Sequence, residues 1–168
     1  MNVFENDGCY LLSFHWNGRQ QAHGQTPDIS AAADSARRWA EGFDLESLAA
    51  AHPFIEFSGL QLAYERGVAV EFQWAELLNA VEEEERAFRD LVILASRDDF
   101  LKQLFPRLGH RFALSANEYS QGILVAVFVY RPGWFVIYGD DGTFEFEGDA
   151  RQVVDYLGHR LAVMRQDG

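Results

Sequence analysis

The side chains of this sequence best suited to acid–base, nucleophilic or metal chemistry are five histidines and one cysteine. No pair of them has the H-x-x-x-H or C-x-x-C spacing of a metal site. The chain also contains no G-x-S-x-G elbow, phosphate-binding glycine loop or dinucleotide fingerprint. We therefore predict no catalytic residue, no metal and no cofactor. The six residues are Cys9, His15, His23, His52, His110 and His159.

Two of these histidines are the candidates for a general base. A two-residue turn at 17–18 would place His23 opposite Leu12, on the strand face that carries Trp16. His110 begins a strand after a helix. A packed, hydrogen-bonded histidine is the more frequent role at such positions, and catalysis is the alternative, which histidine-to-alanine variants would test.

Carboxylates gather at one predicted hairpin. Asp140 and Asp141 lie in its turn, and we expect Glu145 and Glu147 on the exposed side of the strand that follows. Four carboxylates there would suit a basic protein partner. In the alternative, Asp-Gly makes the turn and the glutamates protect an edge strand from pairing. The other acidic run, residues 82–85, is interpreted as the solvated start of a helix.

Aromatic residues offer a different kind of site. The chain has 14 Phe, 6 Tyr and 4 Trp, so we expect a thick aromatic core. A pocket for a small molecule would lie near one of three tryptophans, with the two candidate histidines as possible lining residues. The possible pocket residues are Trp16, His23, Trp74, His110 and Trp134.

The charge of the chain limits its partners. It has 26 acidic and 14 basic residues, a formal net charge of −12. Nucleic acid and anionic membranes would repel such a surface, whereas a basic protein would be attracted to it. The apolar run at 122–130 is too short to span a bilayer as a helix. With one cysteine and no signal-peptide pattern, we expect a cytoplasmic protein.

The N-terminal third predicts a hairpin followed by helices. Residues 9–16 alternate as a strand, the turn at 17–18 suits type I′ geometry, and 19–23 return as a polar edge strand. A helix then begins with Thr26 as N-cap and ends at Gly42. Asp44 caps a short helix through Ala51, and 54–67 fit a strand or a helix equally well.

The remaining chain predicts helices, then a sheet. One helix carries Val70 and Trp74 on its apolar face, and a second runs from 82 into 91–96. A third is capped by Ser96 and Asp99 and ends at Pro106. Four strands in meander order follow, and Asp149 with Gln152 caps a final helix. The strands lie at about 111–116, 122–130, 134–138 and 143–148.

We therefore predict an α+β fold: an N-terminal β-hairpin, several helices, a four-stranded antiparallel meander and a C-terminal helix packed on the sheet. We find no repeat, linker or change of composition that would split the chain. The expected organisation is a single domain over 1–168, with an ordered core at about 8–165.

Three segments resemble an uncharacterised, mostly actinobacterial domain family labelled as a natural-product-biosynthesis protein. They read "HGQTPDISAAADSARRWAEG", "GVAVEFQWAELLN" and "LASRDDFLKQLFPRLGHRFALS". The resemblance covers about 10–163. Lys102, Asp99 and Gly109 depart from the arginine, proline and serine usual there. The family's Gly-x-Thr…Trp, G-x-x-V-x-x-x-W and L-[RK]-x-L-F-P…His motifs match at Gly24, Thr26, Trp39, Gly67, Val70, Trp74, Leu101, Leu104, Phe105, Pro106 and His110.

These observations together predict a small acidic binding protein, leaning away from enzyme activity, of the immunity kind. It would neutralise a basic effector protein by masking its surface. The alternative is an accessory small-molecule-binding protein of a bacterial natural-product pathway, as the resemblance implies. An enzyme with His23 or His110 as base ranks last. The sequence leaves the oligomeric state open.

Overall fold

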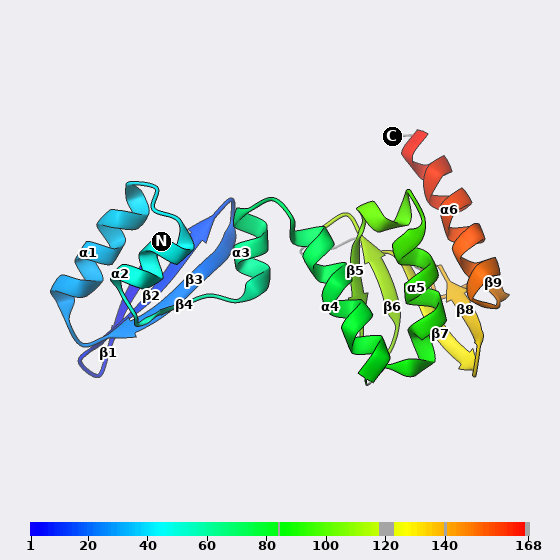
Figure 1. Ribbon diagram of the computed structural model, residues 1–168, viewed down its shortest axis with the longest axis horizontal. Helices are drawn as coiled ribbons and strands as arrows, with labels where there is room; N and C mark the ends of the chain where they lie inside the picture. The colour runs from blue at the N-terminus through cyan, green and yellow to red at the C-terminus, as the bar shows by residue number, and fades with distance from the viewer. Residues whose placement is uncertain (84, 118–122, 140, 167–168) are drawn as a thin grey trace. The chain divides into compact units, whose positions relative to one another are not determined.

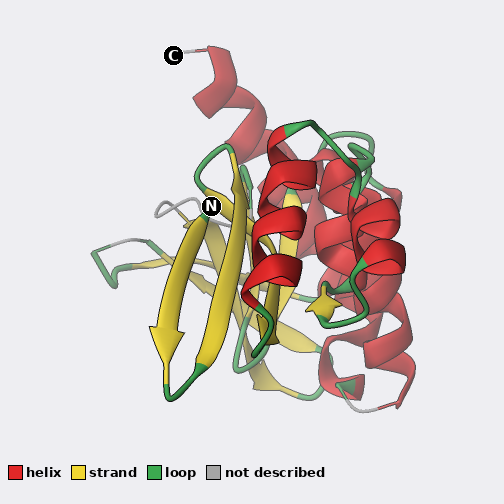
Figure 2. Ribbon diagram, turned by 90° about the vertical axis from the view of Figure 1, so that its left-hand side faces the viewer, coloured by secondary structure: helices red, strands yellow, loops and turns green. Residues whose placement is uncertain are grey.

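The structure is a computed structural model that describes residues 1–83, 85–117, 123–139 and 141–166. The chain divides into two compact units, Met1–Ala69 and Val70–Gly168, and each has its own antiparallel sheet (Figure 1). Each unit combines helices with strands, and Figure 2 distinguishes the two kinds of element by colour, so the α+β class is confirmed. The finer layout differs, because the expected layout had one sheet and a separate hairpin. The single-domain organisation stays a prediction.

The N-terminal unit holds a four-stranded sheet in the order β1-β2-β3-β4. The turn at Asn17 and Gly18 has φ of 50° and 75°, which confirms the expected type I′ hairpin. The 19–23 segment is longer than expected and is not an edge, because β4 pairs with it. The strands are β1 (Asn2–Asn6), β2 (Cys9–Trp16), β3 (Arg19–Thr26) and β4 (Ile55–Glu56).

Strand β1 lies before the ordered core expected from the sequence. All five of its side chains are exposed, so no buried alternation marks it as a strand. Its signal is the turn that follows, where Asp7 and Gly8 have φ of 49° and 78° and lead directly into β2. An Asp-Gly turn at Asp7 and Gly8 thus precedes the expected Asn-Gly turn at Asn17 and Gly18.

Helix α1 (Ile29–Ala40) begins at a different cap from the one predicted. Asp28 is the N-cap, and its carboxylate accepts hydrogen bonds from the backbone N–H groups of Ser30 and Ala31. Thr26 still belongs to β3, which runs three residues further than expected. Gly42 ends the helix as predicted: its φ is 86°, and its N–H donates to the carbonyl of Trp39.

Two short helices complete the N-terminal unit. Asp44 caps α2 (Leu45–Ala51), as expected. The ambiguous segment 54–67 contains both alternatives, β4 and then α3 (Gly59–Glu65), because Ser58 and Gln61 form a capping box between them. The helices and the sheet enclose one core, built from Leu12, Phe14, Ala22, Ala32, Leu45, Leu48 and Ile55.

The C-terminal unit holds a five-stranded meander, β5-β6-β7-β8-β9. The four expected strands are present in the expected order, and β5 is additional. Pro106 does not stop a helix; it lies in β5 opposite Leu114. Its missing N–H is tolerated because β5 is an edge strand. The strands are β5 (Phe105–Leu108), β6 (Phe112–Ser115), β7 (Ile123–Arg131), β8 (Trp134–Tyr138) and β9 (Phe144–Gly148).

The helices of this unit begin and end differently from the prediction. Glu82 lies in the last turn of α4 (Ala69–Glu83), so the acidic run does not start a helix. A 3₁₀ turn at Arg86–Phe88 leads into α5 (Arg89–Arg97). The expected third helix is a 3₁₀ turn at Leu101–Gln103. The Asp98 carboxylate accepts from the N–H groups of Phe100 and Leu101, and the Ser96 hydroxyl donates to the carbonyl of Ile93, so Ser96 and Asp99 form no capping box.

Helix α6 (Ala150–Gln166) starts with the predicted capping box. The Asp149 carboxylate accepts from the N–H of Gln152, whose side chain accepts from the N–H of Asp149, both at 3.0 Å. Its apolar side packs on the sheet, as expected. The core of this unit joins α4, α5 and α6 to the strands through buried residues that include Leu77, Leu91, Val92, Phe112, Phe135, Ile137, Val153 and Leu157.

Candidate functional site

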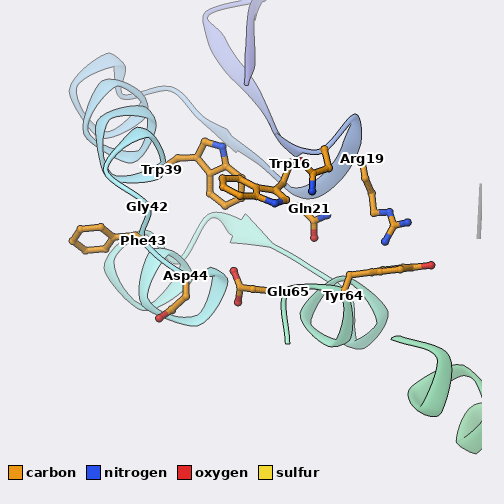
Figure 3. Close-up of a pocket in the computed structure, with 10 residues that line it drawn as sticks. Trp16, Arg19, Gln21, Trp39, Gly42, Phe43, Asp44, Tyr64 and Glu65 are labelled. Carbon is orange, nitrogen blue, oxygen red and sulfur yellow. The ribbon is translucent and has the colours of Figure 1, made fainter. Parts of the chain in front are cut away.

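The N-terminal unit contains a hollow of about 520 Å³. It lies between the end of the β2–β3 hairpin, the α1–α2 connection and the end of α3 (Figure 3). Its volume is within the range of small-molecule sites, and aromatic side chains form much of its lining. We call it the aromatic hollow and define it by Trp16, Arg19, Gln21, Trp39, Tyr64 and Glu65.

Two indole rings lie on one side of the aromatic hollow (Figure 3). Trp16, the last residue of β2, is 63% exposed, so it presents a large apolar surface beside the aromatic hollow. Trp39 is half-buried in α1 and packs edge-on against Phe14, with the ring centroids 5.6 Å apart. Because Phe14 is fully buried, Trp39 rests on a fixed support, whereas Trp16 is exposed.

The buried polar group of the aromatic hollow is Gln21. Its side chain is 6% exposed, and its Oε1 atom has no hydrogen-bond partner among the described residues. The cause is a β-bulge: Phe14 pairs with Ala22 and His15 with Gln20, so Gln21 has no residue opposite it and turns inward. An unpaired buried acceptor costs about 1–3 kcal/mol, which a donor from a ligand would offset.

Glu65 lies across the aromatic hollow from the two indoles (Figure 3). Its carboxylate accepts the backbone N–H of Leu45, at 3.0 and 3.3 Å. Glu65 is exposed overall, but partial desolvation of its carboxylate raises its pKa above the usual range. Asp44 and Glu46 act in the same direction, and the Leu45 N–H and Arg66 oppose them. Among the described residues Glu65 has no ion-pair partner, since Arg66 binds Glu46 instead.

Arg19 and Tyr64 close the remaining side. The Cζ atom of Arg19 lies 3.1 Å from the centroid of the Tyr64 ring, so the guanidinium stacks on the phenol face. In Figure 3 the arginine lies above the ring, at the edge of the aromatic hollow. The one cation of the hollow is thus already engaged by an aromatic ring.

The two predicted pocket residues of the N-terminal unit are Trp16 and His23, and they do not share a site. Trp16 lines the aromatic hollow, but His23 does not face it. The register places His23 opposite Ser13 rather than Leu12, because the bulge at Gln21 shifts the pairing by one residue. His23 is exposed, with its Nε2 atom 3.6 Å from a carboxylate oxygen of Glu56. The expected placement of His23 on the aromatic face is therefore wrong.

The other three predicted pocket residues belong to the C-terminal unit. Trp74 is a core residue whose indole N–H donates to the carbonyl of Leu104 at 3.1 Å. His110 is exposed beside a shallow hollow that Phe128 lines. Trp134 is half-buried under Arg131, whose Cζ atom lies 5.0 Å from the ring centroid. These three have separate surroundings and form no common site.

The acidic hairpin is only partly the exposed patch that we expected. Glu145 binds Arg160 of α6 at 2.8 Å, and its side chain is 20% exposed. A bulge places Phe146 opposite Ile137 and Phe144 opposite Tyr138, so Glu145 has no strand partner and turns toward α6. The expectation that Glu145 is exposed is therefore wrong.

The other carboxylates of the hairpin differ in their surroundings. Asp141 accepts from the N–H and the hydroxyl of Thr143, at 2.9 and 2.6 Å, and so stabilises the turn. Glu147 is exposed, as expected. Asp140 lies outside the described residues. The partner-binding role of this hairpin stays a prediction, with Glu147 as its exposed carboxylate.

The two glutamates of β9 provide a matched pair for a stability measurement. We expect Glu145→Gln to lower the free energy of unfolding by about 1 kcal/mol, because it removes a partly buried charged hydrogen bond to Arg160. Glu147→Gln should change it by less than about 0.5 kcal/mol. Urea unfolding of both variants would measure this. Equal effects of the two substitutions would contradict the assigned ion pair.

Five residues of the aromatic hollow were missed by sequence reasoning: Arg19, Gln21, Trp39, Tyr64 and Glu65. Gln21 was assigned to a polar edge strand, and Trp39 was assigned to the apolar face of α1 without a site. Glu65 lay in a segment of undecided structure. The bulge that turns Gln21 inward has no sequence signature, whereas the helix end at Gly42 gives a usable signal for the position of Trp39.

The structure also bears on metal binding and on membrane crossing. Within the described ranges, no three His, Cys, Asp or Glu side chains lie close enough to bind a metal ion together. The same residues contain no helix with the length and apolarity that a membrane crossing requires.

The chain was compared with known proteins. No protein-family model matches it, and neither curated proteins nor solved structures give a match. The resemblance to the actinobacterial family therefore stays a prediction.

Proposed function

We propose that this protein binds a small organic molecule in the aromatic hollow and does so without catalysing a reaction. The observation that carries the proposal is Gln21, whose buried Oε1 atom has no donor among the residues that the structure describes. Buried polar groups are nearly always paired, and an exception inside a hollow indicates a partner from outside the chain. This is the accessory binding role that was the alternative in the sequence analysis.

The composition of the aromatic hollow supports a ligand with a flat apolar body. The indoles of Trp16 and Trp39 supply large apolar surfaces, and a few polar groups would fix the orientation of the ligand. A volume of about 520 Å³ suits a molecule with one or two rings. The ligand must also carry an N–H or O–H group for Gln21. Because the Oε1 atom of Gln21 has almost no accessible surface, its side-chain amide must turn toward the ligand to accept this group.

Neutralisation of a basic effector protein is the second candidate. The net charge of −12 favours it, because such a surface attracts basic partners. The acidic hairpin favours it less than expected, since Glu145 and Asp141 are engaged within the protein. A complex of this kind would weaken strongly at high salt, whereas binding in the aromatic hollow depends mainly on apolar contact.

An NMR titration of the full chain with one- and two-ring fragments that carry N–H donors tests the proposal. We expect chemical-shift changes at the Gln21 side-chain amide and at the indole N–H groups of Trp16 and Trp39. The indole N–H groups of Trp74 and Trp134 are internal controls, because neither tryptophan lines the aromatic hollow. No change at Gln21 with any fragment would contradict the proposal.

A matched pair of variants in the same unit sharpens this titration. Trp16→Ala should weaken fragment binding about tenfold, since it removes one aromatic wall. Phe4→Ala should leave binding unchanged, because Phe4 is 62% exposed on β1 and does not line the aromatic hollow. If both variants bind equally well, the fragments do not occupy the proposed site.

A further inference from the structure

The aromatic hollow presents more acceptors than donors to a ligand. Among the described residues, the Gln21 amide oxygen has no donor, and the Glu65 carboxylate has one donor, the Leu45 N–H. A carboxylate has about four lone-pair sites, so Glu65 retains acceptor capacity. A ligand that satisfies both residues must therefore bring at least two hydrogen-bond donors.

The charges around the aromatic hollow are unbalanced. Glu65 and Asp44 line it, and neither has an ion-pair partner among the described residues. The carboxylate of Asp44 accepts the Ser47 N–H, which provides no positive charge. Arg19 is the cation of the lining, and its guanidinium stacks on Tyr64. The hollow thus has an excess of negative charge at its Glu65 side.

The aromatic walls suit a cation. A positive group has a stronger electrostatic attraction to the face of tryptophan than to the face of tyrosine or phenylalanine, because the indole face is the most electron-rich. Trp16 and Trp39 lie opposite Glu65 in Figure 3. A cation held between the two indoles and Glu65 would meet electron-rich faces on one side and a carboxylate on the other.

We propose that the ligand of the aromatic hollow is an organic ammonium ion with an apolar body, held by Glu65 as its counter-charge and by Gln21 as a hydrogen-bond acceptor. This inference rests on the proposed function and specifies its ligand class. A primary ammonium group brings three N–H donors, enough for Gln21 and Glu65 together. Its apolar body packs on Trp16 and Trp39.

Ligands of other charge fit the aromatic hollow less well. An anion would lie beside Glu65 and Asp44 and be repelled by both. A neutral ligand would gain no attraction from the charge of Glu65.

The test compares three probes of nearly the same shape on the full chain: 2-phenylethylamine, 2-phenylethanol and phenylacetate. The amine is a cation at pH 7, the alcohol is neutral and the acid is an anion. We expect the amine to bind about tenfold more tightly than the alcohol, and phenylacetate to bind least. Chemical shifts of the Gln21 amide and the Trp39 indole would report binding at the site.

Glu65→Gln should remove the preference for the amine and leave alcohol binding unchanged. The glutamine side chain can still accept the Leu45 N–H, so α2 keeps this contact. Glu56→Gln is the matched control, because Glu56 is an exposed carboxylate of the same unit that does not line the aromatic hollow. It should retain the full preference.

Three results would overturn the inference: equal binding of amine and alcohol, an amine preference that survives Glu65→Gln, or no binding of the amine at millimolar concentration. If the alcohol or a neutral fragment still shifts the Gln21 amide, the proposed function stands without the cation. If no fragment shifts it, the proposed function fails as well.

Discussion

Phe14→Ala is expected to lower the free energy of unfolding of the N-terminal unit by about 3–5 kcal/mol. Phe14 is fully buried at the centre of that unit's core, and its ring supports Trp39. Truncation would leave a cavity beneath the aromatic hollow, so ligand binding should weaken together with stability. Hydrogen exchange at the amides of β2 and β3 would measure the loss of stability.

Leu11→Ala is the control for this truncation. Leu11 lies on the same strand but is 37% exposed, so its truncation should lower the free energy of unfolding far less than the truncation of Phe14. If the two substitutions raised the exchange rates equally, the core of the N-terminal unit would not be organised around Phe14. The support assigned to Trp39 would then be wrong too.

Gln21→Met is expected to raise the free energy of unfolding by about 1–2 kcal/mol and, at the same time, to weaken ligand binding by about tenfold or more. Methionine has nearly the same shape as glutamine, and it removes an acceptor for which the described part of the chain supplies no donor. A ligand would lose its hydrogen bond with that acceptor. Thermal unfolding and a fragment titration of the same variant would measure the two effects.

Gln20→Met serves as the control for Gln21→Met. Gln20 is exposed and precedes Gln21 on β3, so its replacement should leave both stability and binding nearly unchanged. A stability loss in Gln21→Met would mean that the amide is satisfied within the protein. The argument for a ligand at this position would then fail.

Several elements followed from local chemistry that the sequence displays directly. The Asn17-Gly18 turn has the backbone geometry that this dipeptide favours. Gly42 ends α1, and Asp149 with Gln152 starts α6, as their cap patterns indicate. In each case the determining residues lie within four positions of one another, so a short stretch of sequence contains all the information.

The errors came from pairing between distant segments. The bulges at Gln21 and Glu145 each add one residue to a strand. The extra residue reverses which face of the sheet the residues beyond it occupy. Strict alternation therefore placed His23 on the aromatic face and Glu145 in solvent. Pro106 was interpreted as a helix stop because its tolerance in β5 depends on being at a sheet edge.

The aromatic hollow was only partly predictable for the same reason. The sequence analysis named Trp16, whose strand and turn are local features. Gln21 is a polar residue in a polar segment, and its burial depends on a bulge and on the helices that cover β3. The position of Glu65 depends on the end of α3 lying near the start of α2, a contact between residues 20 apart in the sequence. No short pattern records such a contact.

The most direct test of the ligand site is a measurement of intermolecular NOEs between the full-length protein and the tightest-binding fragment of the titration. The account predicts NOEs from the fragment's ring protons to the indoles of Trp16 and Trp39, and from the protons next to its N–H donor to the Gln21 side-chain amide. NOEs to residues outside the aromatic hollow, with none to Gln21, would contradict the account.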